Sequence, residues 1–561
     1  MFGGLIPLLI LGVIVYAIVK NVQDRRQTVR DTDAAPLAVK RVLVFGSLYA
    51  AVHVAAWGLA GLLALLSESG ADRGERAAEP LAMSIVAVPI VFFLGRWVWR
   101  GLTDPAQRDA AFSLYVSVTT LTALIVVMVT AIDSGDWLIS DGDFSASAVS
   151  ALAVWTPIWA VHWRLGRTYR AEVSNAHVYL GSIGALATLA TYGGLLIGDV
   201  FARLLDAGAD TFVDVADRDR VESWLVGLVV AGAAYAVYWF ATARREKRDV
   251  LWHAYVVLVG VMGGLIAAVA GAGIASFGVL QWWLGDPDST SAVRHFEDFI
   301  PALTALVVGG VVWLYHRRVL GPVTGPRTEV QRVYDYVVAG VGLVTAIVGV
   351  VILLVGLQEA VFPPEDSMAS EVNALLGALT TLAVGAPLWM QAWRRAQQNG
   401  RAGDGAELVS PTRRSYLFGI IGVGGAVAAV SLLILLVVVF DALLGDGGDR
   451  LREDIQIPLA ILLTVGAAAV WHFSVLRSDQ EAAPDAPAPQ KKIVLVTGDE
   501  VFATAVRDLT GARVTVLHRL DANGESGDAE AVAAAVAASE YPDLLVLTGP
   551  GSTFQLIPYR R

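Results

Sequence analysis

The chain has 561 residues, of which 55% are hydrophobic and 17% are charged, with a formal net charge of −11 and no cysteine. Soluble globular proteins carry about 25% charged residues, so lipid or other apolar helices must surround most of this chain. The lack of cysteine excludes disulfides, thiolate metal sites and cysteine nucleophiles, and the composition argues against a nucleic-acid partner.

The first predicted element is an apolar run from Phe2 to Val19, which is followed by Arg25, Arg26 and Arg30. A cleaved secretory signal has its basic residues on the N-terminal side of the apolar run. The reverse order here predicts an uncleaved transmembrane helix with its N-terminus outside and its basic flank in the cytoplasm. Residues 1–39 hold this helix and its basic loop.

Residues 40–478 contain six helical hairpins, and both apolar runs of each are long enough to cross a hydrocarbon layer of about 30 Å. With the first helix, this gives an all-α membrane part of about thirteen transmembrane helices. The first helices are predicted at Val42–Leu66, Ala111–Ile132, Val178–Ile197, Leu251–Val279, Tyr334–Leu357 and Tyr416–Leu444. The return helices are predicted at Leu81–Trp99, Ala148–Trp163, Trp224–Phe240, Phe299–Tyr315, Val372–Trp393 and Ile457–Phe473.

The hairpins look like copies of one unit. Return helices end with tryptophan and arginine, which suit the headgroup level and the cytoplasmic side of a membrane. Five first helices begin with a tyrosine, and the sixth has Phe45 at that place: Tyr115, Tyr179, Tyr255, Tyr336 and Tyr416. Two return helices align without gaps, with Pro157, Trp159, Trp163 and Arg164 on Pro387, Trp389, Trp393 and Arg394.

With these tyrosine-led helices and Trp-Arg ends, the chain resembles a bacterial family of multi-spanning membrane proteins called domain of unknown function 5671, whose unit is four helices. The resemblance implies roughly three tandem copies over Lys40–Arg477. It implies no activity, because none is assigned to the family.

Charge predicts the orientation of the membrane part. Basic residues outnumber acids in alternate connections, and acids outnumber basic residues in the others. The basic connections should lie in the cytoplasm, and an odd number of helices that starts outside ends inside. The basic connections are Lys20–Arg41, Arg96–Asp109, Arg164–Glu172, Arg244–Asp249, Arg317–Arg332 and Arg394–Arg414.

The helix interiors are apolar. Gly and Ala at spacings of three and four favour close packing over a pore lining. His53 is the only ionisable residue near a predicted helix centre, and we expect a neutral imidazole bonded to a neighbouring helix rather than a proton relay. His162 and His472 are expected at the membrane interface. Kinks at Pro89, Pro157 and Pro387 could frame a transport site, although proline is common in membrane helices.

Each first helix ends near a carboxylate on the predicted outer side. In a closed assembly these acids could form a ring that attracts cations. The simpler interpretation is that outer loops lack basic residues and carry acids for solubility. The ring would consist of Glu68, Asp133, Asp199, Asp286, Glu359 and Asp441.

A Pro/Ala-rich linker at 479–490 leads to a predicted cytoplasmic α/β domain at 491–561. Its strands are predicted at Ile493–Thr497, Val514–His518 and Leu544–Thr548, with a helix after each of the first two. This βαβαβ unit is half of a doubly wound domain with a parallel sheet, and FQLIPYRR could add an edge strand.

Ligands of such sheets bind beyond the carboxyl ends of the strands. If the strand order is 2-1-3, the loops after the first and third strands are neighbours. Asp499 would repel an anion and can cap a helix, so ordinary turns are favoured over a phosphate site. The candidate ligand-binding residues are Gly498, Asp499, Gly549, Gly551 and Ser552.

We therefore expect a non-enzymatic membrane anchor or sensor that carries a cytoplasmic interaction domain. The alternative is a small-solute or cation transporter or channel. We expect the bilayer as a partner, no cofactor and no metal. A cytosolic protein or a second copy could bind the C-terminal domain, because so small a sheet can cover few of its own faces.

Overall fold

The computed structural model describes residues 34–67, 73–139, 144–206, 216–321, 327–361, 371–401, 405–444, 451–482, 491–497, 499–518, 527–549 and 553–559. The chain divides into two compact bodies. The helical body is Met1–Asn399 with Ser410–His472, and the C-terminal body is Gly400–Val409 with Phe473–Arg561. The predicted first helix, Phe2–Val19, lies outside the described residues.

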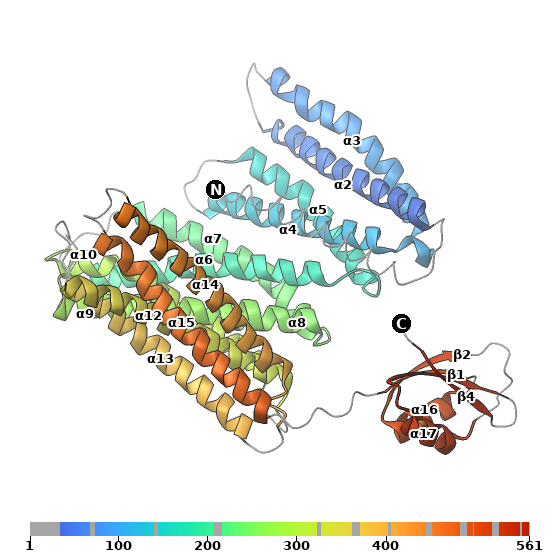
Figure 1. Cartoon of the computed structure of the whole chain (residues 1–561). Helices are drawn as coiled ribbons and strands as arrows, with labels where there is room; N and C mark the ends of the chain where they lie inside the picture. Colours follow the sequence, from blue (N-terminus) through green and yellow to red (C-terminus); the bar gives the residue numbers. More distant parts are fainter. Residues whose placement is uncertain are drawn as a thin grey trace. The chain divides into compact units, whose positions relative to one another are not determined.

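The helical body consists of three successive groups of four long helices, which we call quartets I, II and III (Figure 1). Quartet I holds α2 (Ala34–Ala64), α3 (Arg73–Gly101), α4 (Ala110–Ile139) and α5 (Ala146–Thr168). Quartet II holds α6 (Ala176–Asp206), α7 (Ala216–Tyr235), α9 (Gly264–Leu284) and α11 (Ile300–Leu320). Quartet III holds α12 (Glu329–Val361), α13 (Glu371–Arg401) and α14 (Pro411–Leu444), and its α15 (Leu451–Ala482) continues into the C-terminal body.

Every predicted hairpin helix coincides with a described helix. Eleven helical stretches of the described residues are long and apolar enough to cross a membrane. Helix α5 occupies the predicted span Ala148–Trp163 but is not among the eleven, so the total of thirteen stays a prediction. Helix α15 runs to Ala482, inside the segment expected to be linker.

Quartet II departs from plain α-helix in ways that its apolar pattern does not indicate. Helix α7 continues as the π-helical η3 (Ala236–Phe240), and α8 (Val250–Ala254) continues as the π-helical η5 (Tyr255–Gly263) into α9. A short α10 (Ala292–Glu297) precedes α11. Short 3₁₀ turns, η2 (Pro105–Gln107) and η4 (Ala243–Arg245), lie in two connections.

Glycines allow helices α9 and α11 to approach each other closely. An added Cβ at Gly309 of α11 would lie 2.6 Å from the backbone nitrogen of Ala268 and 2.7 Å from the carbonyl oxygen of Gly264. The two backbones therefore touch, which is how helices associate where lipid supplies no hydrophobic drive. The small-residue stripe of α9 packs here, as expected.

The C-terminal body is a four-stranded sheet in the order β2-β1-β3-β4 with two helices. Strands β1 (Lys492–Thr497), β2 (Arg513–His518) and β3 (Asp543–Thr548) are parallel, and β4 (Phe554–Pro558) pairs antiparallel with β3 at the edge. The strand order meets the condition, 2-1-3, under which the loops after β1 and β3 are neighbours, and the expected edge strand is present. Pro558 is the last residue of β4, where its missing N–H is tolerated.

Helices α16 (Glu500–Thr510) and α17 (Ala529–Ala538) contact each other and lie on the same side of the sheet (Figure 1). Their Phe502 and Val532 pack on Ile493 and Leu544 in one buried core. Residues that alternate with this core along the strands face the other way. The opposite face therefore carries, in register, Val494 and Val496 of β1, Leu517 of β2, Leu545 and Leu547 of β3 and Ile557 of β4.

The backbone contact at Gly309 predicts a difference between two adjacent glycines of α11. Gly309→Val should lower the free energy of unfolding by about 1–3 kcal/mol, because the new side chain overlaps the backbone of α9. An added Cβ at Gly310 meets nothing within 4 Å, so Gly310→Val should leave stability nearly unchanged. Thermal unfolding in detergent measures both, and equal losses would contradict the close approach.

Candidate functional site

Each quartet contains three aromatic rings in contact, the last of which is a histidine, and we call each group a histidine cluster. A ring of the first helix lies 5.1–6.2 Å from a tyrosine of the third helix. That tyrosine lies 5.3–5.7 Å from a histidine of the fourth helix, with the two planes at 61–70°. The clusters are Phe45, Tyr115 and His162; Tyr179, Tyr255 and His316; and Tyr336, Tyr416 and His472.

Each of the three histidines makes the same kind of hydrogen bond within its own helix. The Nδ1 atom of each lies 2.7–2.8 Å from the carbonyl oxygen four residues earlier in its own helix. A carbonyl only accepts, so Nδ1 carries the proton and, in the neutral imidazole, Nε2 is an acceptor. In quartet I the Tyr115 hydroxyl donates to Nε2 of His162 over 2.8 Å. In quartet II, Tyr255 donates to the Tyr235 hydroxyl (3.2 Å), which donates to His316 (3.3 Å).

The third helices of the quartets also begin in the same register. Six residues before the cluster tyrosine of each third helix, a polar side chain accepts a hydrogen bond from the first turn and caps the helix. Three residues before each tyrosine lies a fully buried large side chain. The capping residues are Asp109, Asp249 and Ser410, and the buried residues are Phe112, Trp252 and Arg413.

At the buried position where quartets I and II have Phe112 and Trp252, quartet III has Arg413, whose side chain makes polar contacts. Its guanidinium donates to the Tyr336 hydroxyl (3.1 Å) and to the Gln397 side-chain oxygen (3.2 Å), and it lies over the ring of Trp393. The arginine thereby joins the first, second and third helices of this quartet at the end where the basic connections lie.

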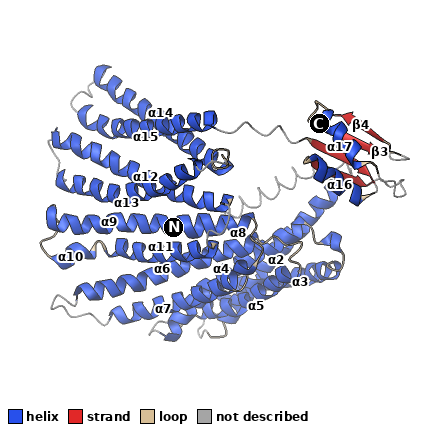
Figure 2. Cartoon of the chain, turned by 90° about the horizontal axis from the view of Figure 1, so that it is seen from below, coloured by secondary structure: helices blue, strands red, loops and turns tan. Residues whose placement is uncertain are grey.

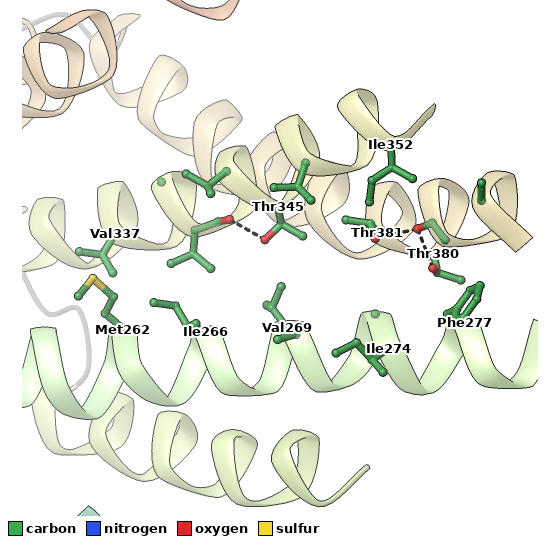
Figure 3. A pocket seen from close by; sticks show the side chains of 18 of the residues that line it. Met262, Ile266, Val269, Ile274, Phe277, Val337, Thr345, Ile352, Thr380 and Thr381 are labelled. Atoms are coloured by element: carbon green, nitrogen blue, oxygen red, sulfur yellow. Dashed lines mark hydrogen bonds between the residues drawn. The ribbon is translucent and has the colours of Figure 1, made fainter. Parts of the chain in front are cut away.

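An apolar groove of about 760 Å³ lies between quartets II and III, where it is lined by α9, α12, α13 and the end of η5 (Figure 3). Its walls carry aliphatic side chains such as Ile266, Ile274 and Val344. Its threonines bond to carbonyls of their own helices: Thr345 to Val341, Thr380 to Leu376 and Gly377, and Thr381 to Gly377. The groove surface is therefore mainly aliphatic, and its threonines have already donated their hydroxyl protons within their own helices.

One histidine prediction is corrected and one histidine was missed. Nδ1 of His53 bonds to the Tyr49 carbonyl of its own helix (2.8 Å), whereas a neighbouring helix was expected. His162 and His472 are buried inside their clusters, and their position at the depth of the membrane interface stays a prediction. His316 was missed, although a shared spacing could have revealed it, because it follows Trp313 as His162 follows Trp159, at three residues.

Five of the six predicted ring acids belong to described residues, and each lies in the last turns of its helix or directly after it. Figure 2 shows the corresponding ends of α6, α9, α12 and α14 on one side of the helical body. Asp199 forms an ion pair with Arg203 one turn later (2.6 Å), and the backbone nitrogen of Asp286 donates to the Asn373 side chain (3.0 Å). Asp133, Glu359 and Asp441 complete the described set, Glu68 lies outside it, and the ring stays a prediction.

Two of the predicted ligand residues of the C-terminal body are described, and both have a structural role. Asp499 caps α16 by accepting from the backbone nitrogens of Val501 (2.8 Å) and Phe502 (3.2 Å). The Gly549 nitrogen donates to the Thr553 carbonyl (2.8 Å). Strands β1 and β3 are neighbours, so the two loops do leave the same edge. Gly498, Gly551 and Ser552 lie outside the described residues, and ligand binding stays a prediction.

Comparison with known proteins identifies one part of the chain. Residues 332–486 match the family described as domain of unknown function 5671. The matched segment is quartet III. This confirms the resemblance for α12–α15, and quartets I and II share with that segment the histidine cluster and the register of the third helix. No curated protein and no solved structure matches the chain.

The bond at Tyr115 predicts which cluster hydroxyls matter for stability. Tyr115→Phe leaves the buried Nε2 of His162 without its donor and should lower the free energy of unfolding by about 1 kcal/mol. Tyr179→Phe is the matched control, because no described residue bonds to the Tyr179 hydroxyl and quartet I already has phenylalanine at that place. Chemical unfolding in detergent should separate the two variants, and equal losses would contradict the assigned bond.

Proposed function

We propose that this chain is a non-enzymatic integral membrane protein that holds an interaction domain at the cytoplasmic face of the cell membrane. The observation that carries the proposal is the apolar face of the C-terminal sheet that neither of the two described helices of this body, α16 and α17, covers. Parallel sheets are ordinarily covered on both faces, whereas α16 and α17 both lie on one. The face formed by Val494, Val496, Leu545 and Leu547, with Leu517 half exposed at 51%, is therefore suited to a protein partner or a second copy.

The chemistry of the helical body supports an anchor over a conduit. Asp, Glu, Lys and Arg lie towards the ends of the described spans and not at their centres, where ion-coupled transporters usually hold a charge. Serine and threonine hydroxyls repeatedly bond to the carbonyl four residues earlier, as Thr119 does to Tyr115 and Ser182 to Val178. Such hydroxyls have already donated their only proton within their own helices.

The repeated histidine clusters support three tandem copies of the family unit. Cap, buried residue, tyrosine and histidine occupy equivalent places in all three quartets, and one quartet carries the family match. The basic connections support the orientation with the C-terminal body in the cytoplasm. Both assignments are part of the proposal.

Cysteine variants test the interaction face and the orientation together, because the native chain has no cysteine. Thr515→Cys reports on the open face, and Thr504→Cys on exposed α16 is the control. In inside-out membrane vesicles, an impermeant maleimide should label Thr504→Cys rapidly and Thr515→Cys several-fold more slowly. Dilute detergent should remove the difference.

Two outcomes would contradict the proposal. Equal labelling in vesicles would mean that the sheet face has no partner there. Labelling of either variant in right-side-out vesicles would reverse the orientation.

A cation transporter or channel is the second candidate, and the acids at one end of α4, α6, α12 and α14 favour it. Under our proposal, liposomes that contain the full chain should pass no more sodium or potassium than empty liposomes. A channel should still conduct when residues 479–561 are deleted. Its flux should fall when Asp133, Asp199, Asp286, Glu359 and Asp441 are changed together to their amides, and ion-sensitive dyes measure each case.

A further inference from the structure

The groove between quartets II and III has dimensions that limit what can fill it. Its α12 wall runs from Val337 to Ile352, about 22 Å at about 1.5 Å per residue. A volume of about 760 Å³ over that length gives a mean cross-section of about 35 Å². An extended hydrocarbon chain is thin enough to lie along the groove.

The walls of the groove are open to the surroundings of the helical body, as the exposed fractions of Ile274 (52%) and Val344 (56%) show. One end is closed by Asn373, which bonds to the backbone of Asp286 through both its side-chain oxygen and its side-chain nitrogen.

Two glycines contribute to this space. Gly273 of α9 and Gly377 of α13 line the groove. An added Cβ at Gly273 would meet nothing within 4 Å, and one at Gly377 would touch only the Phe277 ring, at 3.8 Å. In Figure 3 the labelled side chains of α9 face those of α12 and α13 across the opening.

We propose that this groove is a lipid-binding site that holds one acyl chain of a membrane lipid, which enters sideways from the bilayer. The walls are mainly aliphatic and open to the surroundings of the helical body, which suits a hydrocarbon chain, and the threonine protons are already donated within their own helices. The site is independent of the proposed anchoring role, since it concerns only α9, α12 and α13.

The probe is phosphatidylcholine with a diazirine near the end of one acyl chain, incorporated into nanodiscs with the full chain. After photolysis, mass spectrometry of peptides should find labels concentrated on Ile266–Ile274 and Val341–Val348. The lipid-exposed face of α14, which includes Val423 and Val430, reports ordinary contact with bulk lipid and should be labelled less.

A double variant, Gly273→Leu with Gly377→Leu, fills the groove and should reduce its labelling several-fold. Gly425→Leu on α14 also adds a side chain in open space and should leave groove labelling unchanged. An unchanged thermal midpoint of the double variant would show that its fold is kept. Equal label density on the groove and on α14, or groove labelling that the double variant does not reduce, would overturn the site. Neither outcome alters the cysteine test of the C-terminal sheet.

Discussion

The structure depends on one constraint, which is that the hydrocarbon layer contains no water to satisfy polar groups. The chain meets part of it within single helices, where hydroxyl and imidazole groups bond to carbonyls four residues earlier. Thr119, Thr345 and His162 all follow this pattern. Other polar groups bond between helices, as Tyr115 does to His162 and Trp159 does to Tyr238.

The three histidine clusters show how one packing solution serves different polar demands. In quartet I a tyrosine hydroxyl reaches the imidazole directly, and in quartet II a second tyrosine, Tyr235, completes the connection. In quartet III, Arg413 of the third helix donates to Tyr336, the ring of the first helix. The arrangement of the rings is therefore shared by the three quartets, while the hydrogen bonds around it differ.

The two junctions between quartets differ in a way that matters for function. Quartets I and II meet through large aromatic side chains, with Trp159 donating to the Tyr238 hydroxyl (2.9 Å) and the Trp163 ring 4.6 Å from that of Tyr238. Quartets II and III meet through aliphatic residues such as Leu265 and Val338, with Trp313 and Tyr334 in the same cluster, and the groove remains between them. A ligand in that groove would contact two quartets at once.

The sequence by itself determined the long apolar helices, their pairing into hairpins and the alternation of strand and helix in the C-terminal sheet, whereas the order of its strands comes from the structure. Long apolar runs and strand-helix alternation are local patterns, and Phe45 and the five tyrosines already marked equivalent positions. Only the tertiary structure decided that His162, His316 and His472 are buried beside those tyrosines, because no local pattern states which face of one helix meets another. It also decided that α16 and α17 share a face and that a groove separates α9 from α12, since burial and empty space arise only when helices pack.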